Sequence, residues 1–257
     1  MRAHCGVLSP PESGLATDTG RHREINEDCA RVETPGEASL LRSHGTLAVV
    51  ADGMGGHHAG EVASSLAVEV ICREYYGHTG PPAEALRQAF ERAHAAIRSR
   101  GNGMGTTCTA VAVQDGCAHV AHVGDSRLYL IRGGAVFRMT EDHSDVMERV
   151  RAGQMTAGEA RLHDDRNILL RALGSPSCGV DTQCEPFPLR PGDCLVLSTD
   201  GLHGLVEDAE IGAAAISGDP QAACARLITL ARERGGYDNI TVAVLRCGRK
   251  RESEASG

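Results

Sequence analysis

One feature constrains this chain more than any other: apolar strands that run directly into an aspartate beside a glycine. The run Val49–Ala51 ends at Asp52-Gly53, and three more glycines follow before an amphipathic pattern begins. The run from Leu195 ends in the same way at Asp200, and Asp238 lies just before the last apolar run. One such Asp predicts only a turn. Three of them favour a shared site at the ends of strands, beside flexible backbone that can approach an ion.

Further carboxylates lie at other predicted turns, in Asn26-Glu27-Asp28 and Thr140-Glu141-Asp142. Carboxylates that converge without clustered Cys or spaced His predict a site for a hard cation, Mg²⁺ or Mn²⁺. Arg23 lies five residues before Asp28, and its guanidinium suits phosphate oxygens. The alternative for Arg23 is an ordinary surface arginine. Divalent cations together with a phosphate-binding arginine suggest phosphoryl chemistry.

The periodicity of apolar residues predicts helices packed on sheets. Helical spacing indicates helices over about 60–76 and after Pro81-Pro82, and a period of two indicates an antiparallel meander over 107–139. Residues 143–174 are typical of short helices. The remaining elements are predicted at 193–198 and 240–245 as strands and at 208–216 and 220–234 as helices. This order predicts an α+β fold in a single domain, residues 15–247, with a loose lead-in at 1–14 and a flexible tail at 248–257.

Composition limits the partners. The chain has 34 acidic and 26 basic residues, a net charge of −8, which argues against a nucleic-acid partner. Its ten cysteines form no C-x-x-C pair and resemble small buried hydrophobic residues of a reducing compartment. No signal peptide or membrane span is predicted. We therefore expect a cytoplasmic protein with no membrane partner.

Taken together and in this order, the motifs resemble the metal-dependent protein serine/threonine phosphatases of the PPM, or type 2C, family in their compact bacterial form. The resemblance rests on segments from about residue 15 to 245: Thr17–Gly20, Arg23, Asn26–Asp28, Val50–Ser64, Gly105–Thr107, Gly124–Arg127, Tyr129, Thr140–Ser144, Arg171–Gly174, Pro191–Asp193, Ser198–Leu202 and Asp238–Thr241. It implies a four-layer αββα sandwich with two central antiparallel β-sheets and a mobile flap at about 145–165.

The resemblance also implies the metal ligands. Asp52 would bridge two Mn²⁺ or Mg²⁺ ions, and the Gly53 carbonyl would ligate the second. Asp200 and Asp238 would complete the first, and Asp142 with Asp200 would hold a third ion.

The remaining roles concern water and phosphate. Glu27 and Asp28 would bind metal-bound waters, and Arg23 would hold the substrate phosphate. A metal-activated water would then hydrolyse phosphoserine or phosphothreonine in proteins without a phosphoenzyme. The resemblance implies that this activity opposes a bacterial Ser/Thr kinase and that the protein is a monomer.

One position departs from the family pattern. Animal members carry a general-acid histidine directly after the Asp-Gly, where this chain has Met54. His57 is a candidate for that role, as are His58 and a metal-bound water. Two other functions stay open: a pseudophosphatase that binds phosphoproteins without hydrolysing them, and a metal-dependent phosphohydrolase acting on small molecules.

Overall fold

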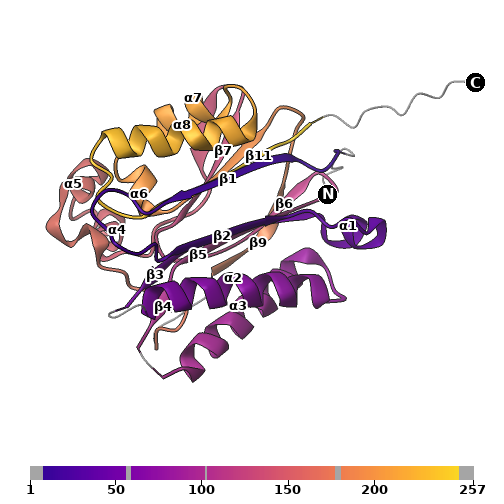
Figure 1. The fold of residues 1–257 in the computed structure, drawn as a ribbon, viewed down its shortest axis with the longest axis horizontal. Coiled ribbons are helices and arrows are strands. Elements are labelled where there is room, and N and C mark those ends of the chain that lie inside the picture. The colour runs from indigo at the N-terminus through magenta and orange to yellow at the C-terminus, as the bar shows by residue number, and fades with distance from the viewer. Residues whose placement is uncertain (1–7, 56–58, 102, 177–180, 249–257) are drawn as a thin grey trace, which may run out of the picture.

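Two antiparallel sheets lie face to face in the centre of the molecule, and helices cover both outer faces (Figure 1). The computed structural model describes residues 8–55, 59–101, 103–176 and 181–248. One sheet has the strand order β1-β11-β10-β7-β8, and the other has β2-β3-β5-β6-β9 with β4 beside β3. The strands are β1 (Glu12–Asp18), β2 (Asp28–Glu33), β3 (Thr46–Met54), β4 (Gly105–Thr106), β5 (Cys108–Gln114), β6 (Cys117–Val123), β7 (Arg127–Arg132), β8 (Ala135–Arg138), β9 (Asp181–Pro188), β10 (Cys194–Ser198) and β11 (Ile240–Arg246).

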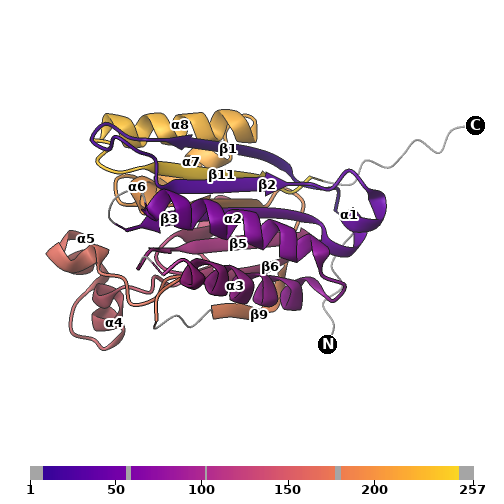
Figure 2. The same cartoon turned by 60° about the horizontal axis from the view of Figure 1, so that its bottom comes forward.

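The helices form the two outer layers and decorate both ends. In Figure 2, α2 and α3 lie across the sheet with the order β2-β3-β5-β6-β9, while α7 and α8 cover the other sheet. Helix α1 lies at one end of the sandwich, and α4 and α5 project at the opposite end. The bounds are α1 (Ala38–His44), α2 (Ala59–Gly77), α3 (Pro82–Ser99), α4 (Asp145–Arg151), α5 (Ala157–Leu162), the 3₁₀ helix η1 (Asp164–Asn167), α6 (Asp200–His203), α7 (Asp208–Ala215) and α8 (Pro220–Glu233).

Three apolar clusters hold the four layers together. The first joins α2 and α3 to their sheet around Ile71, Tyr75 and Phe90. The second joins α7 and α8 to the other sheet, and the third fills the space between the sheets. Burying each large side chain stabilises the fold by about 1.5–3 kcal/mol, so the apolar strands are fixed firmly enough to position polar residues at their ends.

The αββα architecture confirms the predicted fold class, as do the two long helices and the meander from β5 to β8. Six elements were not predicted: α1, β1, β2, β4, α6 and β9. The expectation that residues 1–14 are loose is wrong for Glu12–Gly14, because these residues pair with Val244–Arg246 of β11. A Cβ atom at Gly14 would overlap the backbone of Pro220, so glycine allows β1 to lie close against α8.

The described cysteines fall into two groups. Cys29, Cys72, Cys108, Cys194, Cys224 and Cys247 are free thiols. Cys117 is disulfide-bonded, which differs from the prediction that the cysteines are small buried hydrophobic residues of a reducing compartment. Within the described segments, none of the helices is both long enough and apolar enough to span a lipid bilayer. Residues 249–257 of the predicted tail lie outside the described residues.

Candidate functional site

The sandwich brings the strand-end aspartates together at one end of the two sheets. Asp52 lies near the end of β3, and Asp28, the first residue of β2, is its register partner. Asp200 begins α6, two residues after the end of β10. Asp238 lies two residues before the start of β11, the strand next to β10. In Figure 1 this end is on the left, where β3, β4 and α6 lie.

Side-chain hydrogen bonds connect the two sheets behind these carboxylates. Thr199 Oγ1 donates to Asp28 Oδ2 at 2.9 Å. The Asn239 side chain accepts from the Glu27 N–H at 2.8 Å and donates to the carbonyls of Thr19 and Ile25. The segment between β1 and β2 is therefore held against the start of β11, which places Glu27 and Asp28 beside the other acidic residues.

The carboxylates crowd one another strongly. Burial, followed by the charges of Asp28, Asp200 and Asp125, raises the pKa of Asp52 well above its ordinary value. Burial is also the main cause that raises the pKa of Asp28 to about 7 and that of Asp200 to about 6, with the charge of Asp238 adding to both. Such a cluster is costly in the charged state unless positive charge compensates it.

Two oxygens of the cluster lack the partners that buried polar atoms normally have. Asp28 Oδ1 and Asp200 Oδ1 are buried and accept no hydrogen bond from any described residue. Buried acceptors of this kind call for an ion or an ordered water. The donor set is oxygen only, which is what Mg²⁺ and Mn²⁺ prefer.

The carboxylates do not form a closed cage. Among the described residues, no three His, Cys, Asp or Glu side chains are arranged as a ready-made ligand set. Mg²⁺ usually binds through one or two carboxylates and keeps several waters, so the site fits a cation that stays largely hydrated. The residues present therefore suit divalent cations without a protein-only coordination shell.

Gly53 allows the backbone to approach this cluster closely. Its N–H donates to the Glu27 carbonyl at 3.1 Å. A Cβ atom at this position would overlap the carbonyl of Gly60 at the start of α2. Any side chain would push β3, α2 and the Glu27 loop apart, so the Gly53 backbone lies among the carboxylates only because the residue is glycine.

Arg23 adds a positive group at the open side of the cluster. Its Nη2 donates to Asp238 Oδ2 at 2.9 Å, and its side chain stays 48% exposed. Burial lowers the pKa of Arg23, but the carboxylates of Asp238, Glu27 and Asp52 together raise it above its ordinary value. A half-exposed guanidinium beside a cation site can bind an anion such as phosphate.

The sequence profile of the family described as protein phosphatase 2C matches residues 37–226, which is well over half of the chain. The chain belongs to the protein phosphatase 2C family. It is thus a protein phosphatase by sequence and by fold, as the motifs predicted.

Similar proteins match nearly the whole phosphatase. Protein phosphatase PhpP of Streptococcus pneumoniae is 35% identical over 244 residues, which cover 91% of this chain and 96% of PhpP. The crystal structure of the Mycobacterium tuberculosis serine/threonine phosphatase PstP/Ppp has a TM-score of 0.82 and 32% identity, covering 93% of this chain and 99% of that one. The catalytic domain of PstP in complex with two manganese ions has a TM-score of 0.76 and 31% identity, covering 93% and 98%.

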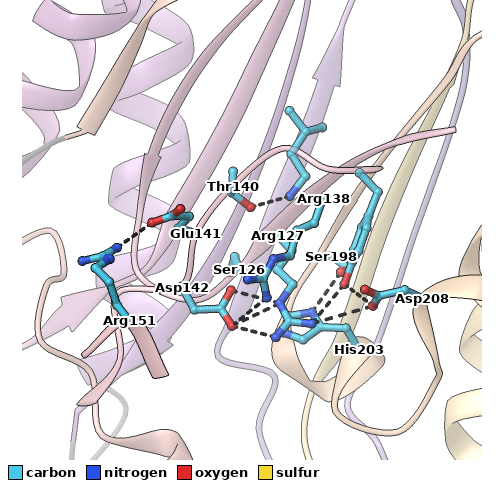
Figure 3. A network of polar contacts seen from close by, with 12 residues as sticks. Ser126, Arg127, Arg138, Thr140, Glu141, Asp142, Arg151, Ser198, His203 and Asp208 are labelled. Atoms are coloured by element: carbon cyan, nitrogen blue, oxygen red, sulfur yellow. Dashed lines mark hydrogen bonds and ion pairs between the residues drawn. The ribbon is translucent and has the colours of Figure 1, made fainter. Parts of the chain in front are cut away.

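Asp142 lies in a different environment from the other predicted ligands of the phosphatase. Arg127 donates to both of its oxygens, at 2.9 Å from Nε to Oδ1 and 2.6 Å from Nη2 to Oδ2, and Arg138 lies 3.6 Å from Oδ2 (Figure 3). Burial lowers the pKa of Arg127, but its bonds to Asp142 raise it above the ordinary value. Two arginines therefore already neutralise the Asp142 carboxylate. This environment differs from the one expected for a metal ligand.

Asp125, for which the sequence pattern predicted no role, joins the acidic cluster instead. Burial, then the charges of Asp200 and Asp142, raises its pKa well above the ordinary value. His143 Nδ1 accepts from the Gly124 N–H at 3.1 Å, and the His143 N–H donates to the Gly124 carbonyl, so this histidine holds the turn that carries Asp125. The signal was present in the sequence, because an apolar run leads directly into Gly124-Asp125, much as another leads into Asp52-Gly53.

The proton donor of the phosphatase is not assigned by the geometry. His57 and His58 lie outside the described residues. Met54 is described, and it ends β3 opposite Gly105 of β4. Its thioether cannot donate a proton, so His57 stays a prediction.

Proposed function

We propose that this protein hydrolyses phosphoserine and phosphothreonine in other proteins, with Mn²⁺ or Mg²⁺ as cofactor. The observation that carries the proposal is the cluster of crowded carboxylates with unpaired buried oxygens beside the half-exposed Arg23. Names of similar proteins support the same reaction: Serine/threonine phosphatase stp of Listeria monocytogenes is 37% identical over 242 residues. The manganese complex of PstP supports the choice of cation.

In this proposal each residue of the cluster has a separate task. Asp52, the Gly53 carbonyl, Asp200 and Asp238 would together hold two divalent cations. The cations, when bound, supply the positive charge that lowers the pKa of the attacking water and stabilises the phosphoryl group. Arg23 holds the phosphate oxygens by its guanidinium.

Two more groups complete the arrangement. Glu27 and Asp28 orient water around the cations, and the hydrogen bond from Thr199 fixes the Asp28 carboxylate for this role. We propose that Asp125, rather than Asp142, pairs with Asp200 at a third cation position. This choice is supported by the charge coupling of Asp125 with Asp200 and by the two arginines that already neutralise Asp142.

The segment 145–165 is proposed to act as a flap beside the site. It contains α4 and α5, which project from the end of the sandwich near α6 (Figure 2). Ion pairs of Arg151 with Glu141 and of Arg161 with Glu207 attach it to the rest of the chain. We also propose that one chain acts as a monomeric catalytic domain up to residue 247, since every residue of the proposed site comes from the same chain.

The test is phosphate release from a phosphothreonine peptide, a phosphotyrosine peptide and a nucleotide, each with and without Mn²⁺. We expect release mainly from the phosphothreonine peptide and only with the metal. Asp52→Asn and Asp238→Asn should each reduce kcat at least 1,000-fold, on the order of 4 kcal/mol of transition-state stabilisation.

Asp115→Asn is the matched control, because it makes the same chemical change at an exposed turn far from the cluster. Unchanged activity in purified Asp52→Asn or Asp238→Asn would contradict the proposal. Binding of the phosphopeptide by wild-type protein without any release would favour the pseudophosphatase alternative.

A further inference from the structure

An aromatic pair lies beside Arg23 at the rim of the site. Tyr237 immediately precedes Asp238, and it is 62% exposed. His22 immediately precedes Arg23, and its ring centroid lies 5.2 Å from that of Tyr237, with an angle of 32° between the ring planes. The neighbours of the Arg23–Asp238 ion pair therefore contact each other as well. We call these two rings the His22–Tyr237 pair.

The two loops that carry the pair are fixed to each other. The Arg21 N–H donates to the Gly236 carbonyl at 2.7 Å. Gly20 has φ +81°, and a Cβ atom there would overlap the Asp238 carbonyl. The backbone at position 20 can lie this close to the Asp238 carbonyl only because the residue is glycine.

The Tyr237 ring also packs against the backbone of its own loop. A Cβ atom at Gly235 would overlap the ring, so the ring lies directly against the backbone of this glycine. A tyrosine has only two side-chain torsions, and one that is already supported loses little further entropy on binding. The pair is thus an exposed aromatic surface in a fixed position.

We propose that the His22–Tyr237 pair binds the apolar residue, aliphatic or prolyl, that flanks the phosphorylated Ser or Thr of the substrate. This inference rests on the proposed function, in which Arg23 holds the phosphate. Consecutive Cα atoms lie about 3.8 Å apart, so a residue next to the anchored phosphoresidue passes within reach of rings adjacent to Arg23. Exposed Tyr rings in fixed positions contribute strongly when they are covered by a partner.

Charge around the pair selects against a basic flanking residue. Arg21 is exposed, and among the described residues it has no ion-pair partner. Arg21 and Arg23 lie on either side of His22 in the sequence. A Lys or Arg in the substrate would bring like charge next to Arg21, whereas an apolar side chain would cover the rings without that cost.

The test compares a phosphopeptide with a small phosphate ester. Tyr237→Ala and His22→Ala are assayed with Mn²⁺ on a phosphothreonine peptide with flanking Leu or Pro, on the same peptide with flanking Lys, and on p-nitrophenyl phosphate. For Tyr237→Ala we expect a roughly tenfold rise in KM for the apolar peptide, with kcat and the kinetics on p-nitrophenyl phosphate unchanged. Tyr237→Phe should keep the wild-type KM, because the ring remains.

Phe137→Ala is the matched control, since Phe137 is an exposed aromatic residue on β8. This variant should leave the kinetics unchanged on both the peptide and p-nitrophenyl phosphate. An unchanged KM for the apolar peptide in Tyr237→Ala would overturn the inference. Equal losses on the peptide and on p-nitrophenyl phosphate would also overturn it, because the rings would then only support Arg23 and Asp238. Wild-type protein without Mn²⁺-dependent activity on any substrate would overturn the proposed function, and this inference with it.

Discussion

Asp200 destabilises the metal-free protein at neutral pH, and its removal should make the fold more stable while it abolishes activity. Burial and the charge of Asp238 raise the pKa of Asp200 from 3.8 to about 6. Each pKa unit corresponds to about 1.4 kcal/mol, so the ionised carboxylate costs up to about 3 kcal/mol of folding free energy at pH 7.5.

The sign of the pH dependence follows from proton binding. Between about pH 4 and pH 6 the folded, metal-free protein holds the Asp200 proton that the unfolded chain has already lost. The folded state binds more protons in this window, so the free energy of unfolding falls as the pH rises, and the loss is complete above about pH 6. Asp28, with its pKa raised to about 7, extends the same trend to higher pH.

The Asp200→Asn variant has no charge at this position. In EDTA at pH 7.5, we expect its free energy of unfolding to exceed that of the wild type by up to about 3 kcal/mol, which corresponds to a rise in Tm of roughly 6–12 °C. At pH 4 the two proteins should have similar stability. Urea and thermal unfolding followed by circular dichroism at pH 4, 6 and 7.5 measure this difference.

Added Mn²⁺ should reverse the order, because only the wild-type cluster binds the cation well and gains stability from binding. Asp115→Asn should behave like the wild type under every condition. The reasoning is refuted if Asp200→Asn is less stable than the wild type in EDTA at pH 7.5. It is also refuted if the stability difference is the same at pH 4 and pH 7.5.

Three further substitutions probe the roles of single residues. Asp125→Asn should keep the fold but weaken Mn²⁺ activation at least tenfold in titrations of activity. Asp142→Ala should lower the free energy of unfolding by about 3–5 kcal/mol, because it leaves the buried Arg127 with only a longer contact to Asp208, at 3.9 Å, as an ion pair. Equal loss of Mn²⁺ activation with an unchanged Tm in both variants would contradict this. Gly53→Ala should lower kcat more than tenfold and lower Tm by several degrees, because its methyl group overlaps the Gly60 carbonyl; wild-type kinetics and melting would show that the close approach is not needed.

The sequence determined the framework of the site through local patterns. Apolar runs ending at Asp52 and Asp200, and the run that follows Asp238, were enough to predict strands that deliver carboxylates to one end of a sheet. These patterns depend only on residues close together in the chain. The elements that were missed have weak local patterns: β1 contains polar residues and Gly14, β2 is short and only partly buried, and β9 contains two prolines.

Tertiary structure decided which charges surround each carboxylate. Asp125 and Asp142 are both turn carboxylates in the sequence. In the structure Arg127 and Arg138 pair with Asp142, whereas the charge of Asp200 helps to raise the pKa of Asp125. The contact between His22 and Tyr237 joins residues more than 200 positions apart, and only the pairing of their loops creates it. Charge compensation and aromatic contact depend on distances in space, and no local periodicity records those distances.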